Sequence, residues 1–92
     1  MADEEHPEHP ESDAIGWVSH YYSQLSVAAV TLEAPLTVGN RIHIKGHTTD
    51  VVQPVESLQV DHRPVERAIP GDDVALKVID HVRERDKIYL EA

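Results

Sequence analysis

Basic side chains at alternate positions are the clearest candidate for a binding surface in this sequence. Arg41, His43 and Lys45 alternate with apolar residues, so a strand would place all three on one face at intervals of roughly 6.6 Å. This interval is close to the spacing of successive backbone phosphates in RNA. Lys77 would extend the surface from a later strand, and His47 would extend it from the following loop. The same pattern is also typical of the solvated exterior of a β-barrel.

The loop His47-Thr48-Thr49-Asp50, taken together with His20 and Tyr21, combines imidazole, hydroxyl and carboxylate groups. These groups are used in acid-base catalysis and in metal binding. Thr and Asp are equally suited to capping turns, and the sequence pairs no nucleophile with an orienting base. We therefore expect no catalytic residue, no metal site and no cofactor, so the chain is predicted not to be an enzyme.

Aromatic residues near the beginning of the chain form a second candidate contact surface. Trp17, together with Tyr21 or Tyr22, would lie on the solvent side of the first strand. Aromatic side chains in such places stack on bases or anchor a protein partner. The alternative is that they plug one end of the barrel, because the chain contains no Phe to do so.

The apolar residues recur mainly with a period of two, which predicts strands rather than helices. The clearest strand has Ile42 and Ile44 on one face and charged residues on the other. Gly39-Asn40 supplies a turn before this strand, and Pro54 indicates an edge position or a bulge in the next one. We expect all-β structure in which six strands form a closed barrel, because closure removes exposed edges. The expected strands are residues 15–22, 27–32, 41–45, 51–60, 74–78 and 86–90.

Length and charge limit the possible functions. Ninety-two residues suffice for one small domain. The formal net charge of -9 opposes tight binding to free nucleic acid. Residues 1–13 carry acidic side chains and two prolines, so we expect a disordered tail there, with His6 and His9 too weakly arranged to hold a metal, followed by one domain over residues 14–92. The absence of Cys and of a long apolar run fits a soluble, monomeric, cytoplasmic protein that does not enter a membrane.

Several turns together resemble the second, β-barrel domain of translation GTPases of the elongation factor Tu type. Residues 35–40 are similar to the Val-Gly-Asp turn of those barrels, and residues 71–74 to a later Gly-Asp turn. Residues 83–86 are similar to the last turn, with Arg85 where an Arg-Gly-Asp pattern has Gly. More narrowly, residues 18–22, 44–50 and 55–59 resemble small proteins described as translation elongation factor-like. The resemblance extends over residues 14–90.

This resemblance implies a non-catalytic binding module associated with the translation apparatus, with the ribosome or tRNA-linked components as partners. The contact face would be Arg41, His43, Lys45 and His47, supported by Lys77. The chain has no Gly-x-x-x-x-Gly-Lys-Ser/Thr loop and therefore should not bind GTP by itself. The same barrel also resembles the C-terminal domain of collagenase-like peptidases. That alternative implies an accessory barrel that docks onto a separate enzyme, with the contacts made by Trp17, Tyr21 and Tyr22.

Overall fold

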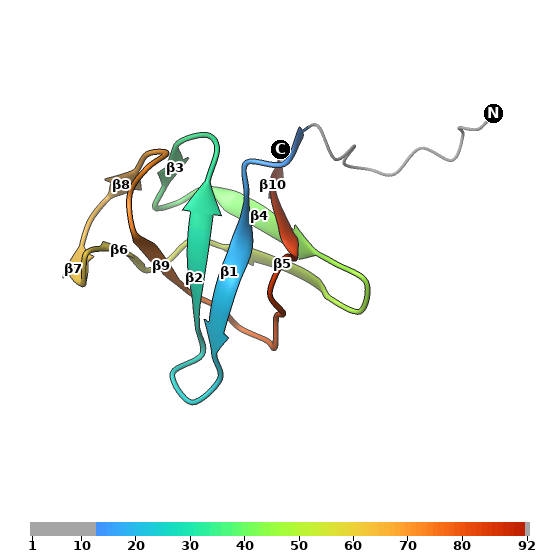
Figure 1. Cartoon of the computed structure of the whole chain (residues 1–92). Helices are drawn as coiled ribbons and strands as arrows, with labels where there is room; N and C mark the ends of the chain where they lie inside the picture. The colour runs from blue at the N-terminus through green and yellow to red at the C-terminus, as the bar shows by residue number, and fades with distance from the viewer. Residues whose placement is uncertain (1–12, 92) are drawn as a thin grey trace.

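The computed structural model describes residues 13–91. This range contains ten short strands joined by turns and loops (Figure 1). Two of them, Val27–Leu32 and Arg41–Lys45, have the bounds that the alternation of apolar residues predicts. No helix in residues 13–91 is long and apolar enough to cross a membrane. The strands are β1 (Gly16–Tyr22), β2 (Val27–Leu32), β3 (Leu36–Thr37), β4 (Arg41–Lys45), β5 (Asp50–Pro54), β6 (Leu58–Val60), β7 (Arg63–Pro64), β8 (Arg67–Ala68), β9 (Val74–Lys77) and β10 (Lys87–Glu91).

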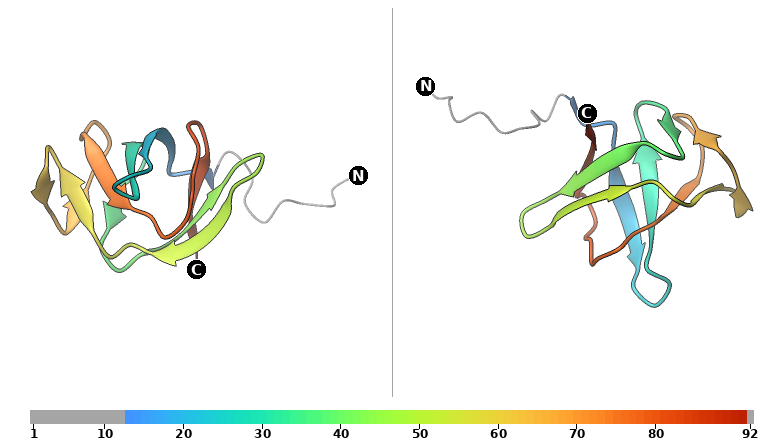
Figure 2. Two further views of the ribbon diagram at one scale, coloured as in Figure 1. Left: turned by 90° about the horizontal axis from the view of Figure 1, so that it is seen from below. Right: turned by 180° about the vertical axis from the view of Figure 1, so that it is seen from behind.

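Eight of the described strands form one antiparallel sheet in the order β5-β4-β10-β1-β2-β9-β6-β7, and β3 pairs separately with β8. The large sheet curls into a half-barrel, as Figure 2 shows. The all-β prediction is confirmed, but the closed six-stranded barrel is wrong. Residues 51–60 contribute to two strands rather than one. β5 ends at Pro54, and β6 begins at Leu58 near the opposite end of the strand order, where it pairs with β9 and β7. Residues 1–12, which include most of the predicted tail with His6 and His9, lie outside the described range.

The concave face of the curled sheet is filled by branched aliphatic side chains. Ile42, Ile44 and Ile88 are fully buried, as the alternation in their strands predicts. The alternation that buries Ile88 also predicts Leu90 inside, and this is wrong, because Leu90 is 45% exposed near the end of β10 whereas the neighbouring Tyr89 is buried. With no Phe available, the core depends on close packing of Val, Ile and Leu.

Two turns use glycine where the backbone adopts a positive φ. Gly39 has a φ of 99° and Gly71 a φ of 96°, a conformation that is costly for residues with a Cβ atom. Arg85 adopts a φ of 76° in the turn before β10, at the position where the resemblance has glycine. The Asp86 carboxylate accepts a hydrogen bond from the Arg83 N–H at 2.8 Å, which holds this turn closed.

A side chain bridges the seam where the sheet does not close. The buried Gln53 on β5 donates from Nε2 to the Lys77 carbonyl oxygen at 2.9 Å, and its Oε1 accepts from the Ile79 N–H at 2.9 Å. In a closed sheet, the Lys77 carbonyl and the Ile79 N–H would instead form hydrogen bonds with the backbone of a neighbouring strand. The amide of Gln53 therefore replaces backbone pairing between β5 and the end of β9.

Candidate functional site

The predicted basic surface on β4 is interrupted by a buried histidine. Arg41 and Lys45 are exposed, but His43 is only 4% exposed, so the expectation that all three lie in solvent is wrong. His43 points to the outer face as alternation requires, yet it lies between Tyr89 and Val52 of the two neighbouring strands. The sequence could not show this, because burial there depends on side chains of paired strands.

The carboxylates of Asp50 and Glu91 lie beside the His43 ring. Its Nε2 lies 2.5 Å from Asp50 Oδ1, and its Nδ1 lies 3.2 Å from Glu91 Oε2. His47 is exposed in the β4–β5 loop. Lys77 is also exposed, but it lies on the other side of β5 from the basic residues of β4, because Gln53 of β5 bonds to Lys77 on one side while β4 pairs with β5 on the other. The cations are therefore mixed with acidic groups rather than gathered into one positive surface, which disfavours phosphate binding.

The contact with His43 has a testable effect on acid stability. The hydrogen bond from His43 lowers the pKa of the Asp50 carboxyl; desolvation opposes this, and the charges of His43 and Lys45 lower the pKa further. Because the folded-state pKa lies below the unfolded value of about 3.9, the stabilisation is present above that pH and is lost as pH falls through the folded pKa. We expect Asp50→Asn to lower the melting temperature at neutral pH, with the difference from wild type shrinking below about pH 4.

Circular-dichroism melts of wild type and Asp50→Asn across this pH range provide the measurement. Glu56→Gln, which neutralises an exposed carboxylate, serves as the control. A difference between Asp50→Asn and wild type that stays constant down to the lowest pH would contradict the assigned role of the His43 contact.

His20 and Tyr21, which the sequence grouped with the His47 loop, make their described side-chain contacts with residues outside that loop. His20 Nδ1 lies 3.1 Å from Glu84 Oε2, and the Tyr21 ring packs edge-on against His81 with 4.8 Å between centroids. Thr49 is buried within the loop. Across residues 13–91, no three His, Cys, Asp or Glu side chains are placed so that they could hold a metal ion together.

A β-bulge in β1 decides which of the candidate aromatics faces solvent. The register between β1 and β2 shifts between Val18 and His20, so the alternation of faces changes at this point. Tyr21 consequently packs against the core, while Tyr22 lies outside and is 46% exposed. Trp17 is partly covered on the outer face, where Lys87 Nζ lies 6.0 Å from its ring centroid.

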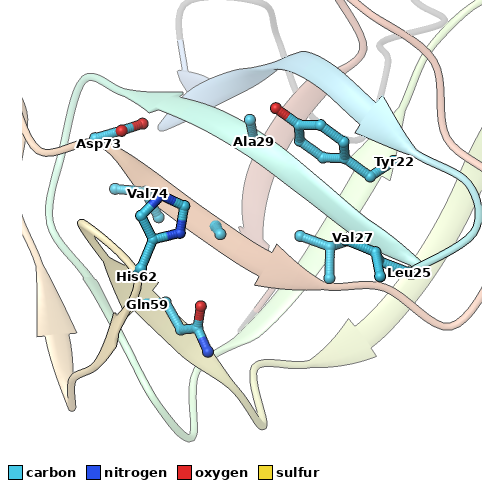
Figure 3. Close-up of a pocket in the computed structure, with 9 residues that line it drawn as sticks. Tyr22, Leu25, Val27, Ala29, Gln59, His62, Asp73 and Val74 are labelled. Atoms are coloured by element: carbon cyan, nitrogen blue, oxygen red, sulfur yellow. The ribbon is translucent and has the colours of Figure 1, made fainter.

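Beside Tyr22, the outer face of the sheet is hollowed into a groove of about 360 Å³, drawn in Figure 3. Ala29 of β2 and Ala75 of β9 are directly paired and form the floor of the groove. The groove is deep at this point because both side chains are small. We call this hollow the β2–β9 groove. It is lined by Tyr22, Leu25, Val27, Ala29, Gln59, His62, Asp73, Val74 and Ala75.

The two sides of the β2–β9 groove differ in character. Tyr22 and the 62% exposed Leu25 form an apolar side, and Gln59, His62 and Asp73 form a polar one (Figure 3). Tyr22 was a candidate contact residue from the sequence, whereas Leu25 was not. The signal for the groove is a pair of alanines in outward positions, and this signal appears only when the register between β2 and β9 is known.

Comparison of sequences relates this chain to longer proteins. No family model matches it. It is 42% identical over 77 residues to an uncharacterized protease of Methanocaldococcus jannaschii, a match that covers 83% of this chain and 19% of that protein. It is 38% identical over 71 residues to a collagenase of Porphyromonas gingivalis, covering 75% of this chain and 20% of the collagenase. The chain thus spans about a fifth of the length of these curated relatives.

Comparison of structures agrees with the sequence matches. The fold superposes on the C-terminal domain of a protein from Geobacillus thermoleovorans described as a U32 peptidase, with a TM-score of 0.82 and 17% identity over 94% of this chain and 100% of that domain. The assignment to elongation-factor domain two, and with it the link to translation, is wrong, since both comparisons lead to proteins named as peptidases. The chain is therefore similar in sequence to one segment of a protease and a collagenase, and it has the fold of a U32 peptidase C-terminal domain.

Proposed function

We propose that this chain is a non-catalytic accessory domain that docks onto a peptidase-type catalytic protein through the β2–β9 groove. The observation that carries the proposal is an exposed apolar hollow on a domain whose relatives are about five times longer and are named as a protease and a collagenase. A partner of this kind replaces the ribosome and RNA components that the sequence suggested.

The chemistry of the groove supports a protein partner. Exposed apolar surface at Tyr22 and Leu25 costs free energy in water, and it is the kind of surface that interfaces cover. Tyr is enriched among the residues that dominate binding energy. The volume of about 360 Å³ lies near the lower end of the range of about 300 to 1,000 Å³ for ligand pockets. This size suits one or two partner side chains that reach the alanine floor.

The burial of His43, the side chain best suited to act as a general base, supports a non-catalytic role. His43 is the buried histidine of the described domain; its Nε2 is hydrogen-bonded to the Asp50 carboxylate, and its Nδ1 lies 3.2 Å from Glu91 Oε2. A general base must reach the proton that it abstracts, and the buried His43 is not among the residues that line the described grooves. In this proposal the catalytic groups belong to the partner.

Replacing Tyr22 and Leu25 together with Ser should weaken capture of the partner by at least about tenfold, because two central apolar anchors are lost. The measurement is affinity purification of the tagged chain from its native lysate, with and without ribonuclease, followed by quantitative mass spectrometry. We expect wild type to recover a peptidase-type protein that resists ribonuclease. Ile69→Ser, which also replaces an exposed apolar residue with Ser, should recover as much of it as wild type.

Two outcomes would overturn this proposal. The first is equal recovery of the peptidase-type protein by wild type and by the Tyr22→Ser, Leu25→Ser variant. The second is recovery of ribosomal proteins alone, lost on ribonuclease treatment, which would return the chain to an RNA-linked role.

A further inference from the structure

Two opposite charges lie on the outer face of the sheet at β9, one just before the strand and one at its last residue. Val74 and Leu76 are buried, so the residues that alternate with them, Asp73, Ala75 and Lys77, face outward. Outward residues follow one another at intervals of about 6.6 Å along a strand. The aspartate and the lysine are therefore about 13 Å apart, with the small Ala75 between them.

The β2–β9 groove continues past Ala75 into a second hollow of about 230 Å³, which we call the Lys77 hollow. It is lined by Val27, Ser57, Gln59, Ala75, Leu76 and Lys77. Val27, Gln59 and Ala75 line both hollows, so the two are continuous. Asp73 lies at the opposite end of the β2–β9 groove from Val27 (Figure 3), and Val27 is paired with Lys77. The combined groove therefore runs along β9 from an acidic end to a basic end, with the alanine floor between them.

Both of these charges are open to a partner. Among the described residues that line the β2–β9 groove, Asp73 is the only Asp, Glu, Lys or Arg, and Lys77 holds the same position in the Lys77 hollow. Both residues are exposed, and neither forms an ion pair within residues 13–91. A second acidic residue adjoins Asp73, because the Asp61 N–H donates to the Asp73 carbonyl at 3.1 Å. One end of the groove thus favours a cation and the other an anion.

We propose that the combined groove receives an extended segment of the docked protein, with a basic side chain against Asp73, an apolar side chain on the alanine floor and an acidic side chain against Lys77. Alternate residues of an extended chain are also about 6.6 Å apart, so these side chains belong to residues i, i+2 and i+4 of the segment. The segment lies over the face of the sheet and needs no free strand edge. The inference rests on the proposed function, since the peptidase-type protein supplies the segment. The apolar contact supplies most of the affinity, and the two charges fix the orientation.

Amide chemical shifts of the labelled full-length chain test this proposal with capped pentapeptides. The mixed peptide is acetyl-Lys-Ser-Leu-Ser-Glu-amide, and the neutral peptide has Gln at both ends. We expect the mixed peptide to shift the amides of Asp73, Ala75 and Lys77 and to bind at about millimolar concentration. It should bind about threefold tighter than the neutral peptide, because two exposed ion pairs are gained. In about 1 M salt, where the screening length is about 3 Å, this difference should disappear.

Reversing one charge of the protein should reverse the choice of peptide at that end of the groove. The acidic peptide has Glu at both ends and the basic peptide has Lys at both ends. Asp73→Lys should favour the acidic peptide over the mixed one, and Lys77→Glu should favour the basic peptide. Each affinity ratio should change by at least about threefold relative to wild type, because an attraction and a repulsion exchange places.

Matched variants correct for the net charge of -9, which by itself favours cationic peptides. Asp13→Lys and Arg41→Glu change the net charge by the same amounts at exposed residues that line neither hollow, so their affinity ratios should stay near those of wild type. Equal ratios in Asp73→Lys and Asp13→Lys would overturn the proposal. Equal binding of the mixed and neutral peptides, or no shifts along β9 at several times millimolar concentration, would also overturn it.

The two proposals fail separately. If the peptides show no preference at either end while the variant with Tyr22→Ser and Leu25→Ser loses the peptidase-type protein, docking at the groove stands and the charged segment is wrong. If the preferences reverse as expected while that variant captures the protein as wild type does, the groove selects segments by charge and the docking site of the peptidase-type protein is wrong.

Discussion

Replacing Gln53 with Leu lowers the free energy of unfolding by about 2 to 4 kcal/mol. Leu has a similar size but cannot pair with the Lys77 carbonyl or the Ile79 N–H, each 2.9 Å from the Gln53 amide. Both backbone groups then face an apolar side chain at the seam, and neither has a strand to bond. The result is a less stable domain whose edge at β5 is no longer tied to the end of β9.

Urea denaturation followed by circular dichroism measures this loss, and hydrogen exchange at the Ile79 amide locates it. Gln59→Leu is the matched control, because Gln59 lies on the outer face of β6, where substitutions usually change stability by less than about 0.5 kcal/mol. If Gln53→Leu and Gln59→Leu unfold at the same urea concentration, the Gln53 amide does not hold the seam. Exchange at Ile79 should be faster in the Gln53 variant and unchanged in the control.

Gly16→Ala should destabilise the domain by about 2 to 3 kcal/mol, although only one methyl group is added. A Cβ atom at Gly16 would collide with the Thr31 carbonyl oxygen and would lie 3.2 Å from the Leu32 Cα atom. Both obstacles are backbone of the paired strand. β1 is also bonded to β10 through the pair of Gly16 with Ile88, so it cannot shift away from β2 without breaking a second set of pairings.

The unfolding midpoint of Gly16→Ala in urea is the measurement, and Gly71→Ala separates the two reasons for glycine in this chain. Gly71 has open space around the position of a Cβ atom and only a positive φ of 96°, so alanine there should cost about 1 to 2 kcal/mol. A smaller loss for Gly16→Ala than for Gly71→Ala would show that β1 relaxes without strain, contrary to the paired geometry.

Period-two alternation in the sequence predicted β1, β2, β4, β9 and β10 as separate strands, but it merged β5 with β6 and missed the two-residue strands β3, β7 and β8. It placed strands at Val27–Leu32 and Arg41–Lys45 with the bounds that the structure has, because alternate residues of a strand face opposite sides whatever its neighbours are. It also assigned Ile42 and Ile44 to the core and Gly39 to a turn. Glycine turns of this kind occur in many small β-domains. They resembled those of an elongation-factor barrel, although the comparisons lead to peptidases instead.

The candidate sites depend on which strands become neighbours. Pairing of β4 with β5 and β10 encloses His43 among side chains that are distant in sequence. The bulge after Val18 turns Tyr22 outward and Tyr21 inward, although the two residues are adjacent and chemically alike. Neither outcome could be predicted from alternation, since a shift of one residue exchanges the two faces of a strand.

The sequence by itself determined that this chain is all-β, which residues of its clearest strands face the core, and where glycine turns the backbone. Only the tertiary structure decided that the sheet stays open, that Gln53 spans the seam, and that Ala29 meets Ala75 beneath a groove. The physical reason is that the face of a strand is a local property of the backbone, with a period of two. Grooves, seams and buried ion pairs are properties of the register between strands, which distant parts of the chain set together.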